Sequence, residues 1–227
     1  AIIEAITYAN AMDVKITSNS WGGGPYTQAV KDLIDAGGAA GYLFIAAAGN
    51  SRDGISDNDA VPSYPAGYDN DNIIAVSATD NRDQLAGFSQ YGLTTVDIGA
   101  PGVDIYSTTG GGYASWPGTS MASPHVAGVA TLLWSYNNTL GGAVIRQAIL
   151  DNADPLPSLA GFVVTGGRLN AFGALRAIIP PTDRGIMSSY VPTGVSGWGL
   201  MQQTQDGFFE VKVGLDSNKT KHYRTST

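Results

Sequence analysis

The chain has 227 residues, of which 43% are hydrophobic and 14% charged, and its net charge at pH 7 is −7. The sequence contains neither the clustered lysine and arginine that a nucleic-acid partner requires nor the 18 consecutive apolar residues of a membrane span, so neither partner is expected. It contains no cysteine, which excludes disulfides, thiol catalysis and cysteine-bound zinc.

The first part of the chain predicts two helices and a strand. Apolar residues recur at helical spacing over residues 1–12, and a short β-prone run follows at 14–18. A second helix begins near residue 27, and we expect Gly37 and Gly38 to end it. Because the helical pattern is already present at the first residue, without Met or a signal peptide, we expect the N-terminal part of the fold to be missing.

The middle of the chain predicts buried strands. Residues 42–49 and 72–79 are continuous apolar runs of strand length, as expected for buried parallel strands. A long loop rich in Asp, Asn, Pro and Gly separates them, and residues 95–102 form a strand that ends in a turn. Such strands, alternating with helices, predict an α/β fold with a mostly parallel sheet.

Helices are expected from residue 120 to residue 178. A long, almost wholly apolar helix covers roughly 120–137, a pattern typical of a helix in the middle of a core. Two further helices are predicted at 142–153 and 167–178.

The sequence changes character after Pro180–Pro181. Residues 208–215 alternate between apolar and polar, which predicts a strand in an antiparallel sheet. We therefore divide the chain into residues 1–179, which form part of an α/β domain, and residues 180–227. The second segment is a linker with a β-prone tail, or the start of a second module.

Ser120 lies where the long apolar helix begins, in the stretch PGTSMASPHVAG. A serine at this position is most often only a helix cap. Here, however, Gly118 and Ala122 leave space for a substrate backbone. The helix N-terminus also offers unpaired N–H groups and a positive potential, which suit a developing oxyanion. Ser120 is therefore a candidate nucleophile.

Asn50 ends an apolar strand in the stretch AAAGN. A loop asparagine usually satisfies the hydrogen bonds of its own turn. The carboxyl ends of parallel strands are nevertheless where open α/β sheets build their sites. The side-chain amide of Asn50 is therefore a candidate hydrogen-bond donor to an oxyanion.

Taken in chain order, these segments resemble the subtilisin-like serine proteases, the subtilases. GTSMASPHVAG is similar to their nucleophile signature, AAAGN to their oxyanion-hole segment and NSWGG to their substrate-binding strand. FSQYG, VDIGAPG and GGRLNAFGAL are similar to further segments. The resemblance covers about residues 1–178. It implies a three-layer α/β fold with helices on both faces of the sheet, and a secreted serine endopeptidase acting on polypeptides.

The resemblance also implies a role for each matching residue. Ser120 would attack the peptide carbonyl and form an acyl-enzyme, while the amide of Asn50 and the N–H of Ser120 would hold the oxyanion. An edge and a pocket would bind the substrate, formed by Ser20, Trp21, Gly22, Ala47, Ala48, Gly49 and Ser63. A cis Tyr64–Pro65 bond and an oxidation-sensitive Met121 are further implications.

The chain departs from the family pattern in one respect. In the family, the catalytic aspartate and histidine precede the substrate-binding strand, whereas here the matching region begins at Ala1. Of the two histidines, His125 is five residues after Ser120 and points away from it on a helix, and His222 lies in the polar tail. We therefore expect the N-terminal remainder of the catalytic domain to supply the base, and this chain alone to be nearly inactive.

The segment from Asp53 to Asp83 contains seven aspartates. A solvated acidic loop is one interpretation. The other is a structural calcium site of the kind that subtilases often contain, although the sequence assigns no metal ligands. The resemblance implies no cofactor for the chemistry itself.

Two functions from different classes fit the sequence. The first is the serine endopeptidase, and the alternative is a non-catalytic peptide-binding module, a pseudoprotease. The retained Ser120, Asn50 and spacious GTSMA turn favour the enzyme, because a pure binder needs no such combination.

Overall fold

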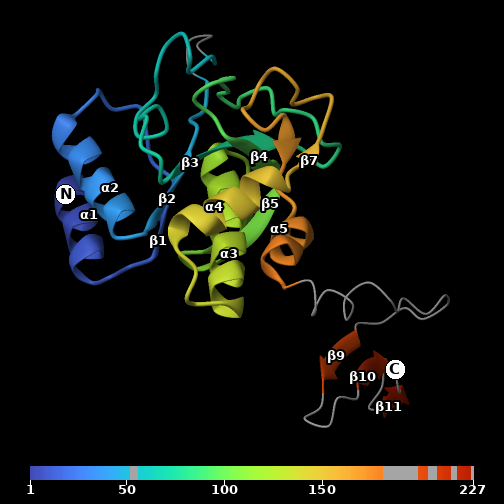
Figure 1. Ribbon diagram of the computed structural model, residues 1–227. Helices are drawn as coiled ribbons and strands as arrows, with labels where there is room; N and C mark the ends of the chain where they lie inside the picture. The colour runs from blue at the N-terminus through green and yellow to red at the C-terminus, as the bar shows by residue number, and fades with distance from the viewer. Residues whose placement is uncertain (52–55, 181–198, 204–208, 216–218, 226–227) are drawn as a thin grey trace. The chain divides into compact units, whose positions relative to one another are not determined.

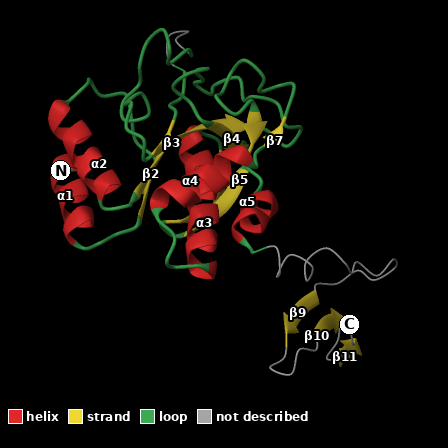
Figure 2. Ribbon diagram, viewed as in Figure 1, coloured by secondary structure: helices red, strands yellow, loops and turns green. Residues whose placement is uncertain are grey.

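The computed structural model describes residues 1–51, 56–180, 199–203, 209–215 and 219–225. The chain forms two compact units, Ala1–Ile178 and Ile179–Thr227. Figures 1 and 2 show the helices and strands of both units.

The first unit alternates helices and strands along most of its length. Its helices are α1 (Ile2–Ala11), α2 (Gln28–Ala39), α3 (Thr119–Tyr136), α4 (Gly142–Asp151) and α5 (Ala171–Ile178). Its strands are β1 (Ile16–Asn19), β2 (Leu43–Ala47), β3 (Ile73–Thr79), β4 (Ile98–Pro101), β5 (Ile105–Thr109), β6 (Gly112–Trp116), β7 (Asp154–Pro155) and β8 (Gly167–Arg168).

The central sheet has the strand order β1-β2-β3-β4-β8-β7. The first five strands of this order run parallel to one another, and the last strand, β7, is antiparallel to β8. Strands β5 and β6 form a separate antiparallel hairpin. The prediction of an α/β fold built on a mostly parallel sheet is therefore confirmed.

Alternate residues of the central strands face opposite helical layers. In β2, Leu43 and Ile45 belong to the core cluster shared with α3, α4 and α5, whereas Phe44 and Ala46 pack with α1 and α2. Every residue of β2 and β3 is buried, as expected for strands covered on both faces. Figure 1 shows α1 and α2 on one side of the sheet and α3 to α5 on the other.

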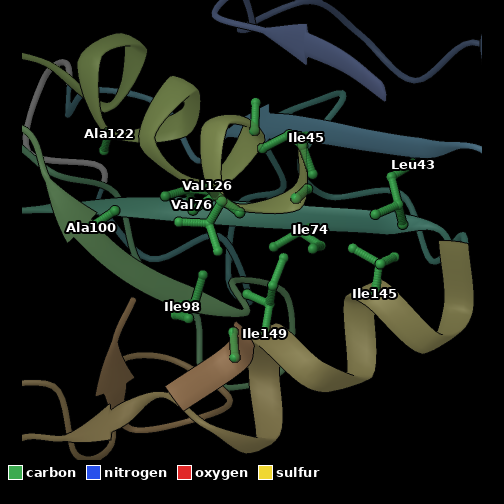
Figure 3. Packing of buried hydrophobic residues seen from close by; sticks show 14 of the residues in the cluster. Leu43, Ile45, Ile74, Val76, Ile98, Ala100, Ala122, Val126, Ile145 and Ile149 are labelled. Carbon is green, nitrogen blue, oxygen red and sulfur yellow. The ribbon is translucent and has the colours of Figure 1, made fainter. Parts of the chain in front are cut away.

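The larger core lies between the sheet and the helix α3. Figure 3 shows Val126 of α3 beside Val76, Ala122 further along the same helix, and Ile145 and Ile149 of α4 near Ile74. All six side chains are fully buried. This packing fixes the first turn of α3, and with it Ser120, against the strands that carry the other candidate residues.

Two sequence expectations about helices are wrong in detail. Gly37 and Gly38 do not end α2, which continues to Ala39. Both glycines lie inside the helix. A Cβ at Gly37 would lie 3.0 Å from Asn10 Oδ1, and a Cβ at Gly38 would lie 2.8 Å from Asn72 Cγ, so crowding explains the small residues at these positions. The helix α3 is not buried all round, since Leu132 and Tyr136 are 44% and 47% exposed.

The hairpin formed by β5 and β6 was not predicted from the sequence. The sequence pattern of a hairpin is weak here, because residues 105–116 lack a clear apolar alternation and contain three consecutive glycines. Tyr106 and Tyr113 stack on one another across the two strands with ring centroids 5.7 Å apart, and both are largely exposed. This cross-strand pair stabilises the hairpin without a core.

The second unit contains an antiparallel sheet of β9 (Gly199–Gln203), β10 (Phe209–Leu215) and β11 (Lys219–Thr225), in the order β11-β10-β9. The strand predicted at 208–215 is thus confirmed as β10. Within the described part of the chain, no helix combines the length and apolar character that crossing a membrane requires.

Candidate active site

The candidate residues meet at the carboxyl edge of the parallel sheet. Ser20 directly follows β1, Gly49 and Asn50 follow β2, and Ser120 is the second residue of α3. Parallel strands end at one edge of a sheet, and this topology brings together residues that lie up to 100 positions apart in the sequence.

A pocket of about 450 Å³ opens at this edge. It is lined by Ser20, Trp21, Gly22, Gly23, Gly24, Ala47, Gly49, Asn50, Val61, Pro62, Ser63, Gln90, Thr119 and Ser120. None of these described lining residues is charged. The pocket therefore suits an uncharged group that enters beside the Ser120 hydroxyl.

Ser120 is partly exposed in the first turn of α3, after the helix cap Gly118. Its Oγ donates a hydrogen bond to the carbonyl oxygen of Ser20 at 3.2 Å. The side chain therefore faces the end of β1 and the pocket rather than the core. Its backbone N–H lies among the unpaired amides of the helix N-terminus, where negative charge is favoured.

Thr119 fixes the orientation of the Asn50 side chain. The Thr119 N–H, which can only donate, lies 3.0 Å from Asn50 Oδ1, and the Thr119 hydroxyl lies 3.2 Å from the same oxygen. The carboxamide oxygen is thus held by the helix, which leaves the Nδ2 donor on the opposite side. Thr119 is fully buried and also accepts a bond from the Gly49 N–H at 3.2 Å.

Two N–H donors flank the space next to Gly118. A Cβ at Gly118 would lie 3.7 Å from Asn50 Nδ2 and 3.6 Å from the Ser120 nitrogen. Gly118 also has φ +153°, a conformation that side-chain-bearing residues rarely adopt. The glycine keeps this space open for an atom that accepts from both donors, the arrangement required to hold an oxyanion.

A chain of hydroxyls joins the end of β1 to α3. Ser20 Oγ donates to the Ser120 carbonyl oxygen at 2.8 Å and lies 3.0 Å from Ser123 Oγ. A serine hydroxyl has one proton, so Ser123 must be the donor in the second contact. The fully buried Ser123 therefore holds Ser20, and Ser20 in turn holds the backbone of Ser120.

His125 is turned away from the candidate nucleophile. Its Nδ1 lies 2.8 Å from the carbonyl oxygen of Met121 in the same helix, and the side chain is exposed. This placement agrees with the expectation that His125 does not act as the base for Ser120. The side chain of His222 lies outside the described residues.

The segment 20–24, whose first three residues are predicted to bind substrate, pairs with Tyr64 at its far end. Gly23 N–H donates to the Tyr64 carbonyl at 3.1 Å, and Gly24 bridges Tyr64 in the antiparallel sense. This pairing joins the edge to the segment that carries Ser63, which lines the pocket. The Tyr64–Pro65 peptide bond is cis, as the family resemblance implied.

Ala48 does not line the pocket, contrary to the sequence-based assignment. It is fully buried and packs with Val96, Leu159 and Val163 in a separate small cluster. The physical reason is the alternation of side chains along an extended segment, which turns Ala47 and Gly49 toward the pocket and Ala48 away from it.

Sequence reasoning missed several residues of the site. The additional lining residues are Gly23, Gly24, Val61, Pro62, Gln90 and Thr119. Thr119 and Gln90 lie inside the recognised segments GTSMASPHVAG and FSQYG, so a residue-by-residue examination of those segments could have found them. Val61 and Pro62 lie in the long loop, where no local pattern indicates a site.

Several of the described aspartates between Asp53 and Asp83 bond to other groups of the protein. Asp59 accepts from the Thr94 N–H and from the hydroxyls of Thr94 and Thr95. Burial opposes the ionisation of Asp59, but these hydrogen bonds outweigh it and lower the pKa of the carboxyl. Asp83 pairs with Arg168. The described residues contain no group of three or more His, Cys, Asp or Glu side chains suited to a metal ion.

Comparisons with known proteins agree with this geometry. A family profile described as "Subtilase family" matches residues 1–183. "Thermophilic serine proteinase" from Bacillus sp. (strain AK1) is 42% identical over 175 residues, which cover 77% of this chain and 41% of that protein. Thermitase from Thermoactinomyces vulgaris is 41% identical over 177 residues, covering 78% of this chain and 59% of that protein.

A solved structure also shares the fold. The prenylagaramide maturation protease PagA has a TM-score of 0.67 at 26% sequence identity, over 79% of this chain and 67% of that one. The chain thus spans between 41% and 59% of the length of the two curated relatives described above.

Proposed function

The chain belongs to the subtilase family, and from that premise we propose that it supplies the nucleophile, the oxyanion donors and the substrate-binding edge of a serine endopeptidase. The substrate is a polypeptide, and the reaction is hydrolysis of a peptide bond through an acyl-enzyme on Ser120. Residues 1–179 are the C-terminal part of the catalytic domain in this proposal, and residues 180–227 follow as a linker and β-rich tail.

Each residue has a defined part in the reaction. Ser120 Oγ forms a bond to the carbonyl carbon, and the carbonyl electron pair moves to the oxygen, which accepts hydrogen bonds from Asn50 Nδ2 and the Ser120 N–H. The hydroxyl proton passes to a histidine base and then to the leaving amine as the C–N bond breaks. Water hydrolyses the resulting ester in a second, equivalent cycle.

The observation that carries the proposal is the shared space beside Gly118. The donors Asn50 Nδ2 and Ser120 N lie 3.7 and 3.6 Å from the point that a Cβ of Gly118 would occupy, with Met121 Sδ at 3.3 Å, and both Asn50 and Ser120 line the pocket. A helix cap or an ordinary loop asparagine would not require a glycine between two such donors. Acyl transfer does require donors that can reach one oxyanion.

We propose that the histidine and aspartate of the triad come from the N-terminal remainder of the catalytic domain. His125 bonds the carbonyl of Met121, and the Ser120 hydroxyl donates to the carbonyl of Ser20 instead of to a base. Removal of triad members from a subtilisin lowers turnover by about 10⁴- to 10⁶-fold. The chain without that remainder is accordingly expected to be nearly inactive, and the complete enzyme to act outside the cell.

The proposal is tested by peptidase assays on the protein that includes the upstream region. We expect cleavage of an unfolded protein substrate, and loss of this cleavage in Ser120→Ala. A fluorophosphonate should modify the unmutated protein once, at Ser120. Ser135→Ala, which removes an exposed hydroxyl from the far end of the same helix, serves as the matched control and should leave both results unchanged.

The rival function is a peptide-binding module without chemistry. The bond from Ser120 Oγ to the Ser20 carbonyl is compatible with it, because this hydroxyl is not activated in the described residues. The same assays separate the two functions. Peptide binding without cleavage or fluorophosphonate labelling, in a protein that includes the upstream region, would favour the binding module.

A further inference from the structure

We propose that Gln90 is a specificity-determining residue, whose carboxamide sets the depth and the charge preference of the pocket beside Ser120. This inference rests on the proposed peptidase function. It concerns the substrate side chain that precedes the cleaved bond, because that side chain is attached next to the carbonyl that Ser120 attacks and enters the adjoining pocket.

The backbone places Gln90 directly against the strand that carries the oxyanion donor. Gln90 N–H donates to the Gly49 carbonyl at 2.9 Å, and Asn50 and Ser89 form an antiparallel bridge. Ser51 N–H donates to the Phe88 carbonyl in the same ladder. The segment 88–90 is thus paired with 49–51 by two backbone hydrogen bonds, which form this bridge and fix the backbone position of Gln90.

The Gln90 side chain reaches the pocket beneath Gly49. A Cβ at Gly49 would lie 1.8 Å from Gln90 Oε1 and 3.2 Å from Ser63 Oγ. The two side-chain oxygens therefore approach the same point of the pocket from two different loops. Gly49 also has φ +113°, so both its conformation and its contact with Gln90 exclude a larger residue.

Burial shows which part of the pocket Gln90 occupies. Gln90 is only 8% exposed, whereas Asn50 and Ser20 at the mouth are exposed, and all three line the same pocket. Gln90 therefore lies at the closed end, with the half-buried Ser63 beside it. A side chain that enters from Ser120 meets an uncharged carboxamide there.

The closed end of the pocket, its floor, should select between charged and neutral substrate side chains. The described lining residues carry no charge, so a lysine or glutamate side chain would lose hydration at the floor without gaining a partner. A neutral side chain loses less hydration free energy when it enters the pocket. The length of Gln90 limits how far any side chain can penetrate, since a shorter residue at this position would leave an additional space beneath Gly49.

The test is a set of peptide anilides that differ only in the residue before the cut, assayed with the enzyme that includes its N-terminal remainder. Gln90→Glu keeps the size of the floor and makes it negative. We expect the ratio of kcat/KM for lysine over leucine to rise about tenfold, and the ratio for glutamate over leucine to fall similarly. Gln90→Ser shortens the floor and should raise the ratio of tryptophan over leucine by about fivefold or more.

Gln84→Glu is the matched control, because it makes the same change of charge on an exposed loop whose side chain bonds the Arg82 carbonyl. Its ratios should stay within about twofold of those of the unmutated enzyme. Ratios cancel a general loss of activity, so partial misfolding does not imitate the effect. Unchanged ratios in both Gln90 variants would overturn the inference while leaving the peptidase function intact. Failure of the unmutated enzyme to cleave any peptide would overturn both.

Discussion

Buried hydroxyl side chains fix the positions of the groups that we propose to react. Thr119 holds the oxygen of the Asn50 carboxamide, and Ser123 holds the hydroxyl of Ser20. Both are fully buried, so their hydrogen bonds are shielded from water and their loss is costly. The geometry of the site therefore depends on buried polar residues that are one and three positions away from the nucleophile.

Replacement of Ser123 by alanine should lower activity more than stability. The variant removes the donor to Ser20, which loosens the substrate edge relative to Ser120 Oγ, and we expect kcat/KM to fall about tenfold. Ser123→Thr retains the hydroxyl and should restore most of this loss. Peptidase kinetics and thermal melting of both variants check the result. Equal activity of the alanine and threonine variants would contradict a positioning role.

Replacement of Asn50 by leucine should act on the transition state. The Nδ2 donor would be lost while the pocket stays uncharged, so kcat should fall with little change in KM. We expect a loss of about 100- to 1,000-fold, the range found when one such donor is removed from a subtilisin. Steady-state kinetics on a single peptide substrate provides the measurement. A rise in KM at constant kcat would show that Asn50 only binds substrate.

Among the elements, α4 is attached to the sheet by a largely buried ion pair. Arg146 donates to Asp97 Oδ1 at 2.7 Å and to the Ile73 carbonyl at 2.8 Å, and Asp97 also accepts from the Ala75 N–H. Burial raises the pKa of Asp97, while the guanidinium of Arg146 and the Ala75 N–H oppose that rise. Removal of the arginine alone would leave a buried carboxyl without its charge partner.

Arg146→Met is therefore expected to lower the free energy of unfolding by about 2–3 kcal/mol, somewhat less than for a completely buried pair. The measurement is denaturant unfolding at pH 7. Lys31→Met removes a lysine that pairs with the exposed carboxylates of Asp35 and Asp69, and it should change stability little. If both variants lowered the free energy of unfolding equally, the burial of the Arg146–Asp97 pair would not explain its contribution to stability.

The loop that carries Asp59 should loosen in acid. The hydrogen bonds from Thr94 and Thr95 hold the folded pKa of Asp59 below its ordinary value of 3.8. A carboxyl with a lowered folded pKa contributes stability that is complete above the unfolded pKa and is lost as the pH falls through the folded value. The protection factor of the Thr94 amide, which is its exchange rate relative to the intrinsic rate at each pH, should therefore fall between pH 6 and a pH below 3.8. Asp59→Asn should remove this pH dependence.

The elements show what local patterns could and could not predict. The strands β2 and β3 were predictable because a fully covered strand is a continuous apolar run. The passage of α2 through Gly37 and Gly38 was not, because those glycines are explained by contacts with Asn10 and Asn72, which are remote in the sequence. Propensity describes a residue's own conformation and carries no information about distant neighbours.

For the molecule as a whole, the sequence predicted the parallel sheet and most of the site but not the shape of the pocket. Ser120, Asn50 and Ser63, which line one pocket, were predicted as site residues from short segments of the sequence. The assignment of Ala48 to the pocket failed because it ignored the alternation of an extended segment. Gln90 was missed because its role depends on the pairing of two segments forty residues apart, which no local motif encodes.

The chain on its own should be poorly soluble. β1 is the terminal strand of the sheet among the described strands, and α1 beside it exposes Ile2, Ile3 and Tyr8 by 44%, 44% and 66%. An open edge next to apolar surface promotes association. Co-expression with the upstream region should give a monodisperse product that melts at a higher temperature, as size-exclusion chromatography and calorimetry would show. A monodisperse, cooperatively melting 227-residue chain would contradict this expectation.

The most direct measurement is a crystal structure of the complete enzyme after reaction with a peptidyl fluorophosphonate. The account predicts phosphorus bonded to Ser120 Oγ, with one phosphonyl oxygen about 2.7–3.1 Å from both Asn50 Nδ2 and the Ser120 nitrogen. A phosphonate attached to another serine, or an adduct on Ser120 whose oxygen points away from Asn50, would contradict it.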